Sequence, residues 1–222
     1  MTPSTPAFLS RLRQERLVAI VRGTDPEAAL RTVLTLAEEG VHLLEVSLTT
    51  AGALDVIRRA ADLLGPEVLL GAGTVLDADD TRAAAQAGAR WIVTPVVSEA
   101  VPAAVEAGLP VLAGALTPTE AHAAVRAGAD AVKLFPASAG GPDLLRALRD
   151  PLPHIPFVPV GGVDEDAARA YLAAGAVAVG VGSPLVGDAA RGGDTGGLRE
   201  RARAFLAVCR AAAPGRDGGA QA

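Results

Sequence analysis

One basic residue differs from all the others in this chain. Lys133 is the only lysine, and every other strongly basic side chain is an arginine. It lies in an apolar run, with Val132 before it and Leu134 and Phe135 after it. A buried ammonium group is costly unless it is paired, so it tends to lose its proton and become a nucleophilic amine. Arginine cannot replace it, because a guanidinium stays protonated. Lys133 is therefore a candidate nucleophile, and the alternative is a lysine that extends from a strand end to solvent.

A carboxylate in segment 42–48 is the second candidate. Neighbouring residues of a strand face opposite ways, which separates this segment into two faces. One face comprises His42, Leu44, Val46 and Leu48, and the other comprises Leu43, Glu45, Ser47 and Thr49. The first is apolar except at its start and suits a covering layer of helices, so Glu45 turns inward. An interior carboxylate is an acid–base catalyst or a structural partner for an interior cation, and both interpretations bring it towards Lys133.

Three more residues end apolar segments and have side chains suited to a ligand. Thr74 follows two glycines at 71 and 73, which are expected to let a ligand approach the backbone or to form only a tight turn. Its hydroxyl can hydrogen-bond a carboxylate or a hydroxyl. Pro95 ends a similar segment after Thr94. Arg22 is a candidate clamp for a carboxylate, or else a rim arginine paired with an acid.

Two glycine-rich turns follow the last two predicted strands. Gly161 and Gly162 come after one of them, and Gly182 and Ser183 after the other. Barrels often bind phosphate at these two turns through exposed backbone N–H groups and a helix N-terminus. The pair predicts a phosphate site, whereas Asp164 just beyond serves only to cap its helix.

The elements that position these residues alternate regularly along the chain. Compact apolar runs predict strands over 17–22, 42–48, 68–72, 91–94, 111–113, 131–135, 157–160 and 178–181. Helical segments separate them, the last running from about residue 198 to 210, and the first dozen residues read as a short lead-in. An Ala-Gly pair ends the helices at 87–88, 107–108, 127–128 and 174–175.

Eight strand–helix units favour a closed (β/α)8 barrel of the TIM type. An open doubly wound sheet is the alternative. It would carry a glycine-rich dinucleotide fingerprint after the first strand, and residues 22–25 do not form one. In a barrel the functional groups come from the C-terminal ends of the strands. A single domain over 1–213 is expected, with a disordered tail over 214–222.

Composition narrows the function classes. The chain has 222 residues, half of them apolar, and a formal charge of −5 without basic runs, which argues against nucleic acid as a partner. No apolar run is long enough to span a bilayer, and no signal peptide is recognisable. The single cysteine, Cys209, fits the cytoplasm, and the three histidines have no metal-ligand spacing. We expect a cytoplasmic enzyme with neither metal nor cofactor.

A lysine, a nearby carboxylate and a phosphate site fit the chemistry of a class I aldolase. The amine attacks a keto group and forms an iminium, which accepts electrons as a C–C bond breaks. The glutamate moves protons at the carbinolamine and at the substrate hydroxyl. A phosphosugar isomerase or epimerase on the same barrel would need a general base but no iminium.

The sequence resembles the 2-keto-3-deoxy-6-phosphogluconate (KDPG) and 4-hydroxy-2-oxoglutarate (KHG) aldolase family over nearly its whole length. The resemblance rests on residues 18–23, 44–46, 71–76, 94–95, 133–137 and 161–162. It implies a (β/α)8 barrel, a homotrimer, a Schiff base between Lys133 and pyruvate or substrate, and Glu45 as the acid–base group. The substrate-binding residues expected are Arg22, Thr74, Pro95, Phe135, Gly161, Gly162, Gly182 and Ser183. Of these, Thr74 and Pro95 would line the pyruvate pocket, and Gly162 and Ser183 would hold the phosphate.

Two positions depart from the phosphogluconate type. Many such members carry an arginine for the pyruvate carboxylate where this chain has Thr49, and a threonine where it has Val160. Relatives that cleave the galactonate epimer resemble this chain at both points, with Arg22 available instead. The implied reaction is cleavage of a 2-keto-3-deoxy-6-phospho sugar acid to pyruvate and glyceraldehyde 3-phosphate. The alternatives are cleavage of 4-hydroxy-2-oxoglutarate to pyruvate and glyoxylate, and a phosphosugar-binding barrel without lyase activity.

Overall fold

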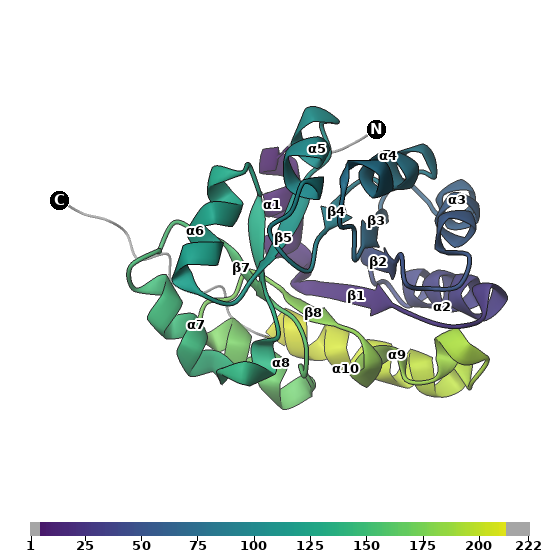
Figure 1. Cartoon of the computed structure of the whole chain (residues 1–222). Coiled ribbons are helices and arrows are strands. Elements are labelled where there is room, and N and C mark those ends of the chain that lie inside the picture. Colours follow the sequence, from purple (N-terminus) through teal and green to yellow (C-terminus); the bar gives the residue numbers. More distant parts are fainter. Residues whose placement is uncertain (1–4, 212–222) are drawn as a thin grey trace.

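Eight parallel strands form one sheet in the computed structural model, which describes residues 5–211 (Figure 1). They are β1 (Leu17–Val21), β2 (Leu43–Ser47), β3 (Leu69–Gly73), β4 (Ile92–Val93), β5 (Val111–Ala115), β6 (Ala131–Leu134), β7 (Phe157–Pro159) and β8 (Val179–Val181). Strands β1 to β7 pair in chain order, and β8 lies beside β1. An isolated parallel bridge between Val160 and Gly180 joins the two ends of the sheet. The sheet is thus a nearly closed (β/α)8 barrel, which confirms the predicted architecture and excludes the open sheet.

Helices cover the outside of this barrel. They are α2 (Pro26–Glu38), α3 (Ala53–Leu63), α4 (Ala78–Gln86), α5 (Ala100–Glu106), α6 (Pro118–Arg126), α7 (Gly141–Arg149), α8 (Glu165–Ala173) and α10 (Thr195–Ala211). Short turns η1 (Ala137–Ala139), α9 (Ser183–Val186) and η2 (Ala189–Arg191) complete the set. The four glycines of the Ala-Gly pairs have φ between 68° and 103°, so they end their helices in the left-handed conformation predicted for them.

Helix starts follow the capping residues in the sequence. The Asp25 side chain accepts hydrogen bonds from the backbone N–H groups of Glu27 and Ala28 at 2.9 and 3.1 Å, and Pro26 is the first helical residue. The Asp164 carboxylate accepts from the N–H of Ala167 at 2.8 Å, which confirms its predicted capping role. These caps orient the helices that return the chain to the next strand.

A helix occupies most of the stretch that was predicted to be a short lead-in. From residue 5 onwards the chain forms α1 (Thr5–Glu15), so the prediction was wrong for the described part of the first dozen residues. Its side chains Phe8 and Leu12 are fully buried, and the Phe8 ring lies 5.4 Å from the Trp91 ring, centroid to centroid. Phe8 and Leu12 belong to the apolar cluster inside the barrel, together with Leu43, Leu69 and other residues at the N-terminal ends of strands. Helix α1 therefore closes the barrel at the end opposite to the predicted site.

Strand parity decides which residues face which layer. Leu44 and Val46 pack in the cluster between sheet and helices, whereas Leu43 belongs to the interior cluster. This arrangement is the one predicted for β2. No helix within residues 5–211 is long and apolar enough to cross a membrane. The expected tail over 214–222, and with it the domain boundary at 213, lies outside the described residues.

Candidate active site at the C-terminal mouth of the barrel

Lys133 projects from the middle of the barrel wall. It is the third residue of β6, paired with Gly114 of β5 and Val158 of β7, and it is only 5% exposed. Its Nζ lies 5.4 Å from the centroid of the Phe135 ring, which follows the strand and is 39% exposed. This burial contradicts the alternative of a lysine that extends to solvent. The side chain instead ends within the barrel, where an amine can meet a substrate.

Glu45 supplies the interior carboxylate. It is 1% exposed, and its Oε1 has no hydrogen-bond partner among the described residues. Burial raises the pKa of Glu45 above its ordinary value, and the positive charges of Lys133 and Arg22 offset only part of that rise. The carboxyl group of Glu45 therefore binds and releases its proton closer to neutral pH than an exposed glutamate does. General acid–base catalysis requires this.

The raised pKa of Glu45 predicts a pH-dependent stability. The folded state binds this proton more tightly than the unfolded chain, so the contribution is fully present below pH 4.5 and is lost as the pH rises towards the folded-state pKa. Glu45→Gln stays neutral at every pH. We therefore expect the variant to unfold at a higher temperature than the parent at pH 8, with the difference shrinking towards pH 4. Calorimetry across this pH range would contradict the prediction if the parent were the more stable protein at pH 8.

The glycines at the end of β3 make room for protein side chains. A Cβ at Gly71 would lie 2.4 Å from the Trp91 ring, and one at Gly73 would lie 1.7 Å from Oε1 of Glu45. Packing against protein side chains thus accounts for both glycines, and the expectation that they admit a ligand to the backbone stays a prediction. They are required because the interior of the barrel is already filled beside them, by the Trp91 ring in one case and by the Glu45 carboxylate in the other.

Three hydroxyl groups lie together beyond Glu45. The Ser47 Oγ is 2.8 Å from Thr49 Oγ1 and 2.8 Å from Thr74 Oγ1. Thr74 has φ of 60°, a left-handed conformation that is strained by roughly 1–3 kcal/mol for a non-glycine residue. Sequence analysis singled out Thr74 but did not place Ser47 in the site. The available signal was that Ser47 shares the inward face of β2 with Glu45.

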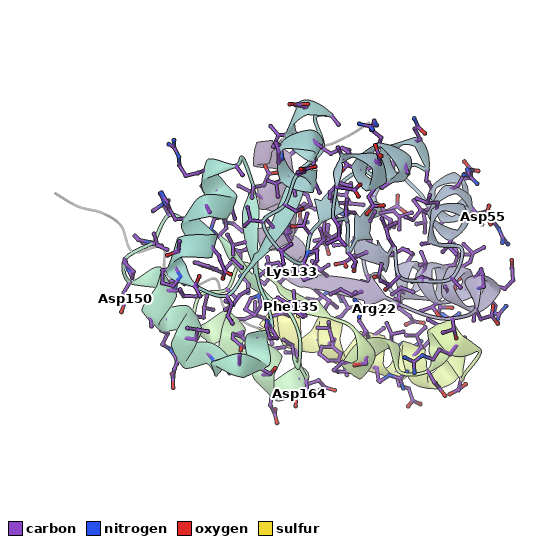
Figure 2. The ribbon with its side chains drawn as sticks, in the orientation of Figure 1. Arg22, Asp55, Lys133, Phe135, Asp150 and Asp164 are labelled. Atoms are coloured by element: carbon purple, nitrogen blue, oxygen red, sulfur yellow. The ribbon has the colours of Figure 1, made fainter. Side chains whose placement is uncertain are left out.

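Arg22 and Pro95 flank this region. Arg22 is exposed just beyond β1, and its charge lowers the pKa of Glu45, which places it within electrostatic reach of that carboxylate. It forms no ion pair within residues 5–211, in contrast to the alternative of a rim arginine paired with an acid. The Pro95 carbonyl occupies the space that a side chain at position 114 would need. Figure 2 shows Arg22, Lys133 and Phe135 near the middle of the molecule.

The glycine-rich turns lie beside the end of β6. Gly161 and Gly162 have φ of 96° and 73°, and the Gly161 carbonyl accepts a hydrogen bond from the N–H of Ser138 at 3.1 Å. A Cβ at Gly161 would come within 3.2 Å of the Phe135 ring. Gly182 and the exposed Ser183 begin the short helix α9 after β8. The first of these turns therefore adjoins the segment that carries Lys133.

Within residues 5–211, no group of three or more His, Cys, Asp or Glu side chains is placed to hold a metal ion. Cys209 is fully buried in the apolar layer under α10, and burial raises the pKa of its thiol to about 11. Lys133, and not the cysteine, is therefore the candidate nucleophile of this chain.

The fold and the site together define a (β/α)8 barrel with a buried amine and a buried carboxylate inside its wall, an arrangement suited to imine chemistry. The KDPG and KHG aldolase family model matches residues 9–195. The chain belongs to this family and is an aldolase, hence a lyase.

Known relatives agree with this assignment. The chain is 39% identical over 171 residues to the 2-dehydro-3-deoxy-6-phosphogalactonate aldolase of Escherichia coli K12, covering 76% of this chain and 83% of that one. A solved structure described as native KDPGal superposes with a TM-score of 0.82 at 37% identity, over 88% of this chain and 95% of that one. The KDPG aldolase of Legionella pneumophila, solved with pyruvate captured as a covalent carbinolamine, has a TM-score of 0.76 at 26% identity and covers 92% of this chain and 98% of its own.

Proposed function

We propose that this chain is a Schiff-base aldolase that reversibly cleaves a 2-keto-3-deoxy-6-phospho sugar acid to pyruvate and glyceraldehyde 3-phosphate. One observation carries the proposal above all. The single lysine and a carboxyl group without a hydrogen-bond partner are both buried inside the barrel, near its C-terminal mouth. The relative from Legionella pneumophila, which holds pyruvate as a covalent carbinolamine, supports the same chemistry for this chain.

The proposed reaction begins with attack of the Lys133 amine on the C2 keto carbon. Glu45 delivers a proton to the resulting carbinolamine, which loses water and becomes an iminium. The carboxylate then accepts the proton of the C4 hydroxyl as the C3–C4 bond breaks, and the electron pair moves into an enamine. Glyceraldehyde 3-phosphate leaves. Protonation of the enamine and return of one water molecule release pyruvate and restore the amine.

The remaining residues are assigned to the two ends of the substrate. Thr74, Pro95 and Phe135 lie around the pyruvate end, where Thr74 offers a hydroxyl. The phosphate end is assigned to the turns with Gly161, Gly162, Gly182 and Ser183, whose backbone N–H groups suit an anion. These turns favour a phosphorylated substrate over 4-hydroxy-2-oxoglutarate. Pyruvate release from each compound, followed with a coupled reductase, tests this. Faster turnover of 4-hydroxy-2-oxoglutarate would replace the proposed substrate, and release from neither compound would leave a binding protein or an isomerase.

Arg22 is proposed to bind the substrate carboxylate. It is exposed beyond β1 and has no ion-pair partner within the described part of the chain. Arg22→Ala is expected to raise the KM for the keto acid by roughly tenfold to a hundredfold, the range for loss of a charge-assisted hydrogen bond. Arg22→Lys should fall between, because an ammonium cannot form the bidentate pair. Arg126→Ala, which removes an exposed arginine from α6, is the control. An unchanged pyruvate affinity in Arg22→Ala would contradict the proposal that Arg22 binds the carboxylate.

Val160 is proposed to favour the galactonate epimer. Its side chain is 7% exposed, faces the barrel interior and packs where a side chain at Gly180 would lie. It offers no hydrogen bond to the C4 hydroxyl. Val160→Thr is expected to shift the ratio of kcat/KM values towards the gluconate epimer by about tenfold, equivalent to one hydrogen bond. Val181→Thr, on the helix-facing side of β8, is the control. An unchanged ratio in assays of both epimers would assign the preference to other residues.

We further propose a cytoplasmic homotrimer. Large apolar side chains are exposed in the loops after β3 and β4, at Leu76 (48%), Val96 (50%) and Val97 (37%), and burying such side chains against another copy of the chain would favour self-association. The single cysteine, kept as a buried thiol, is in keeping with a reducing compartment.

A further inference from the structure

Ser47 has a position that the proposed reaction does not yet use. It ends β2 on the same inward face as Glu45 and is fully buried. Its Oγ contacts Thr49 Oγ1 and Thr74 Oγ1, each at 2.8 Å. Thr49 is exposed and Thr74 is half-buried, so the cluster runs from solvent, through a buried hydroxyl, to the end of β3. We propose that Ser47 is a positioning residue that fixes the Thr74 hydroxyl as a hydrogen-bond donor to an acceptor oxygen of the 2-oxo acid.

The possible directions of the hydrogen bonds within the cluster support this role. Each hydroxyl has one proton and accepts through its lone pairs. Ser47 is buried and has these two side-chain partners within residues 5–211, so its proton goes to Thr49 or to Thr74. If it goes to Thr74, the Thr49 proton can go to Ser47, and the Thr74 proton is free for a ligand. If it goes to Thr49, the Thr74 proton is used within the cluster.

The class of ligand decides between these two arrangements. A carboxylate or keto oxygen only accepts hydrogen bonds, so it selects the order Thr49 to Ser47 to Thr74 to ligand. In that order each hydroxyl is polarised by the one before it, which strengthens the last donor. The same cluster without Ser47 would leave the Thr74 hydroxyl free to rotate, and ordering it would oppose binding.

The backbone of Thr74 indicates that its side chain is held in place. A β-branched residue at φ of 60° is a genuine outlier, and such strain persists only where the surroundings over-determine it. The neighbouring backbone is fixed on both sides, because the Leu48 N–H donates to the Gly73 carbonyl at 2.7 Å and the Val75 N–H donates to the Val93 carbonyl at 3.2 Å. The Ser47 hydroxyl adds a side-chain hydrogen bond to Thr74 beside these two backbone hydrogen bonds. Thr74 is therefore presented by a rigid frame, as a binding group requires.

The test rests on the proposed function and uses the dissociation constant of pyruvate, measured from the concentration dependence of borohydride trapping. Ser47→Ala is expected to raise this constant by roughly tenfold, the range for one lost hydrogen bond. Its kcat with saturating substrate should change by less than about threefold, because Lys133 and Glu45 are untouched. Ser47→Thr, which keeps the hydroxyl, should restore most of the affinity. The control is Thr32→Val, which deletes another fully buried hydroxyl, on α2.

A double-mutant cycle separates positioning from a general structural role. If Ser47 acts through Thr74, adding Ser47→Ala to Thr74→Val should change the pyruvate constant by less than about twofold, because the donor is already absent. Equal losses in both backgrounds would overturn the inference. So would wild-type affinity in Ser47→Ala while the parent still traps pyruvate, a result that leaves the proposed function intact. Failure of the parent to trap pyruvate would instead overturn both. If Ser47→Ala is unstable, Ser47→Cys replaces it in the same comparison. The thiol has a similar shape to the hydroxyl but is only a weak hydrogen-bonding group.

Discussion

Incubation with pyruvate and borohydride is expected to add one reduced adduct to this chain, at Lys133. The chain offers only one lysine, so the N-terminal amine is the sole other amine that imine chemistry can label. Mass measurement of the intact protein and of its peptides therefore locates the adduct without ambiguity. Lys133 is 5% exposed, and its neighbours Val132 and Leu134 pack towards the helices, so the lysine side chain faces the barrel interior.

Lys133→Arg is the matched variant for this experiment. It keeps a basic side chain of similar length in β6, but its guanidinium stays protonated and cannot form the imine. We expect no pyruvate-dependent adduct and a loss of turnover on the order of 10⁴-fold or more, as for other enzymes that lose a covalent nucleophile. Circular dichroism and a melting curve confirm that the variant is folded. Adducts on the N-terminus alone, or full activity in a folded Lys133→Arg, would remove the Schiff-base mechanism.

Glu45→Gln is expected to have the second-largest effect, a fall in kcat of roughly 10²–10⁴-fold, the contribution typical of a positioned general acid–base group. The amide has almost the same shape and fills the space beside Gly73, so packing is retained. Burial raises the pKa of Glu45, and the variant should therefore lose the limb of the pH–rate profile that this carboxyl group gives to the parent. The measurement is kcat between pH 5 and 9 for both proteins.

A carboxylate elsewhere in the chain provides the control for Glu45. Glu39 lies at the end of α2 and pairs with Arg199 and Arg203 on α10, outside the barrel. Glu39→Gln removes the same charge and should leave kcat and its pH dependence unchanged. Slow formation of the Lys133 adduct in Glu45→Gln, with its final amount unaltered, would agree with proton transfer by Glu45. A Glu45→Gln variant with the parent's kcat would instead show that another group or water transfers the proton.

The sequence by itself determined the chemistry and the architecture. A lone lysine among nineteen arginines, in an apolar run, indicates an amine with a chemical role, because a solvated charge needs no such exception. The alternation of strands and helices, with glycine at the helix ends, is local and periodic, so it could be read without coordinates. Strand parity placed Glu45 inside the barrel, since the alternation of side chains in a strand is fixed by backbone geometry.

Only the tertiary structure decided which residues fill the barrel. Helix α1 was missed because its ends carry few local signals, and its stability comes from packing Phe8 against Trp91, a contact between residues far apart in the chain. The sequence offered a ligand or a tight turn as the reason for Gly71 and Gly73, and only the structure shows that Trp91 and Glu45 occupy the space beside them. The meeting of Ser47 with Thr74 likewise depends on the register of β2 against β3. Contacts of this kind form because the sheet closes and brings side chains together. Their spacing along the chain does not predict that they meet.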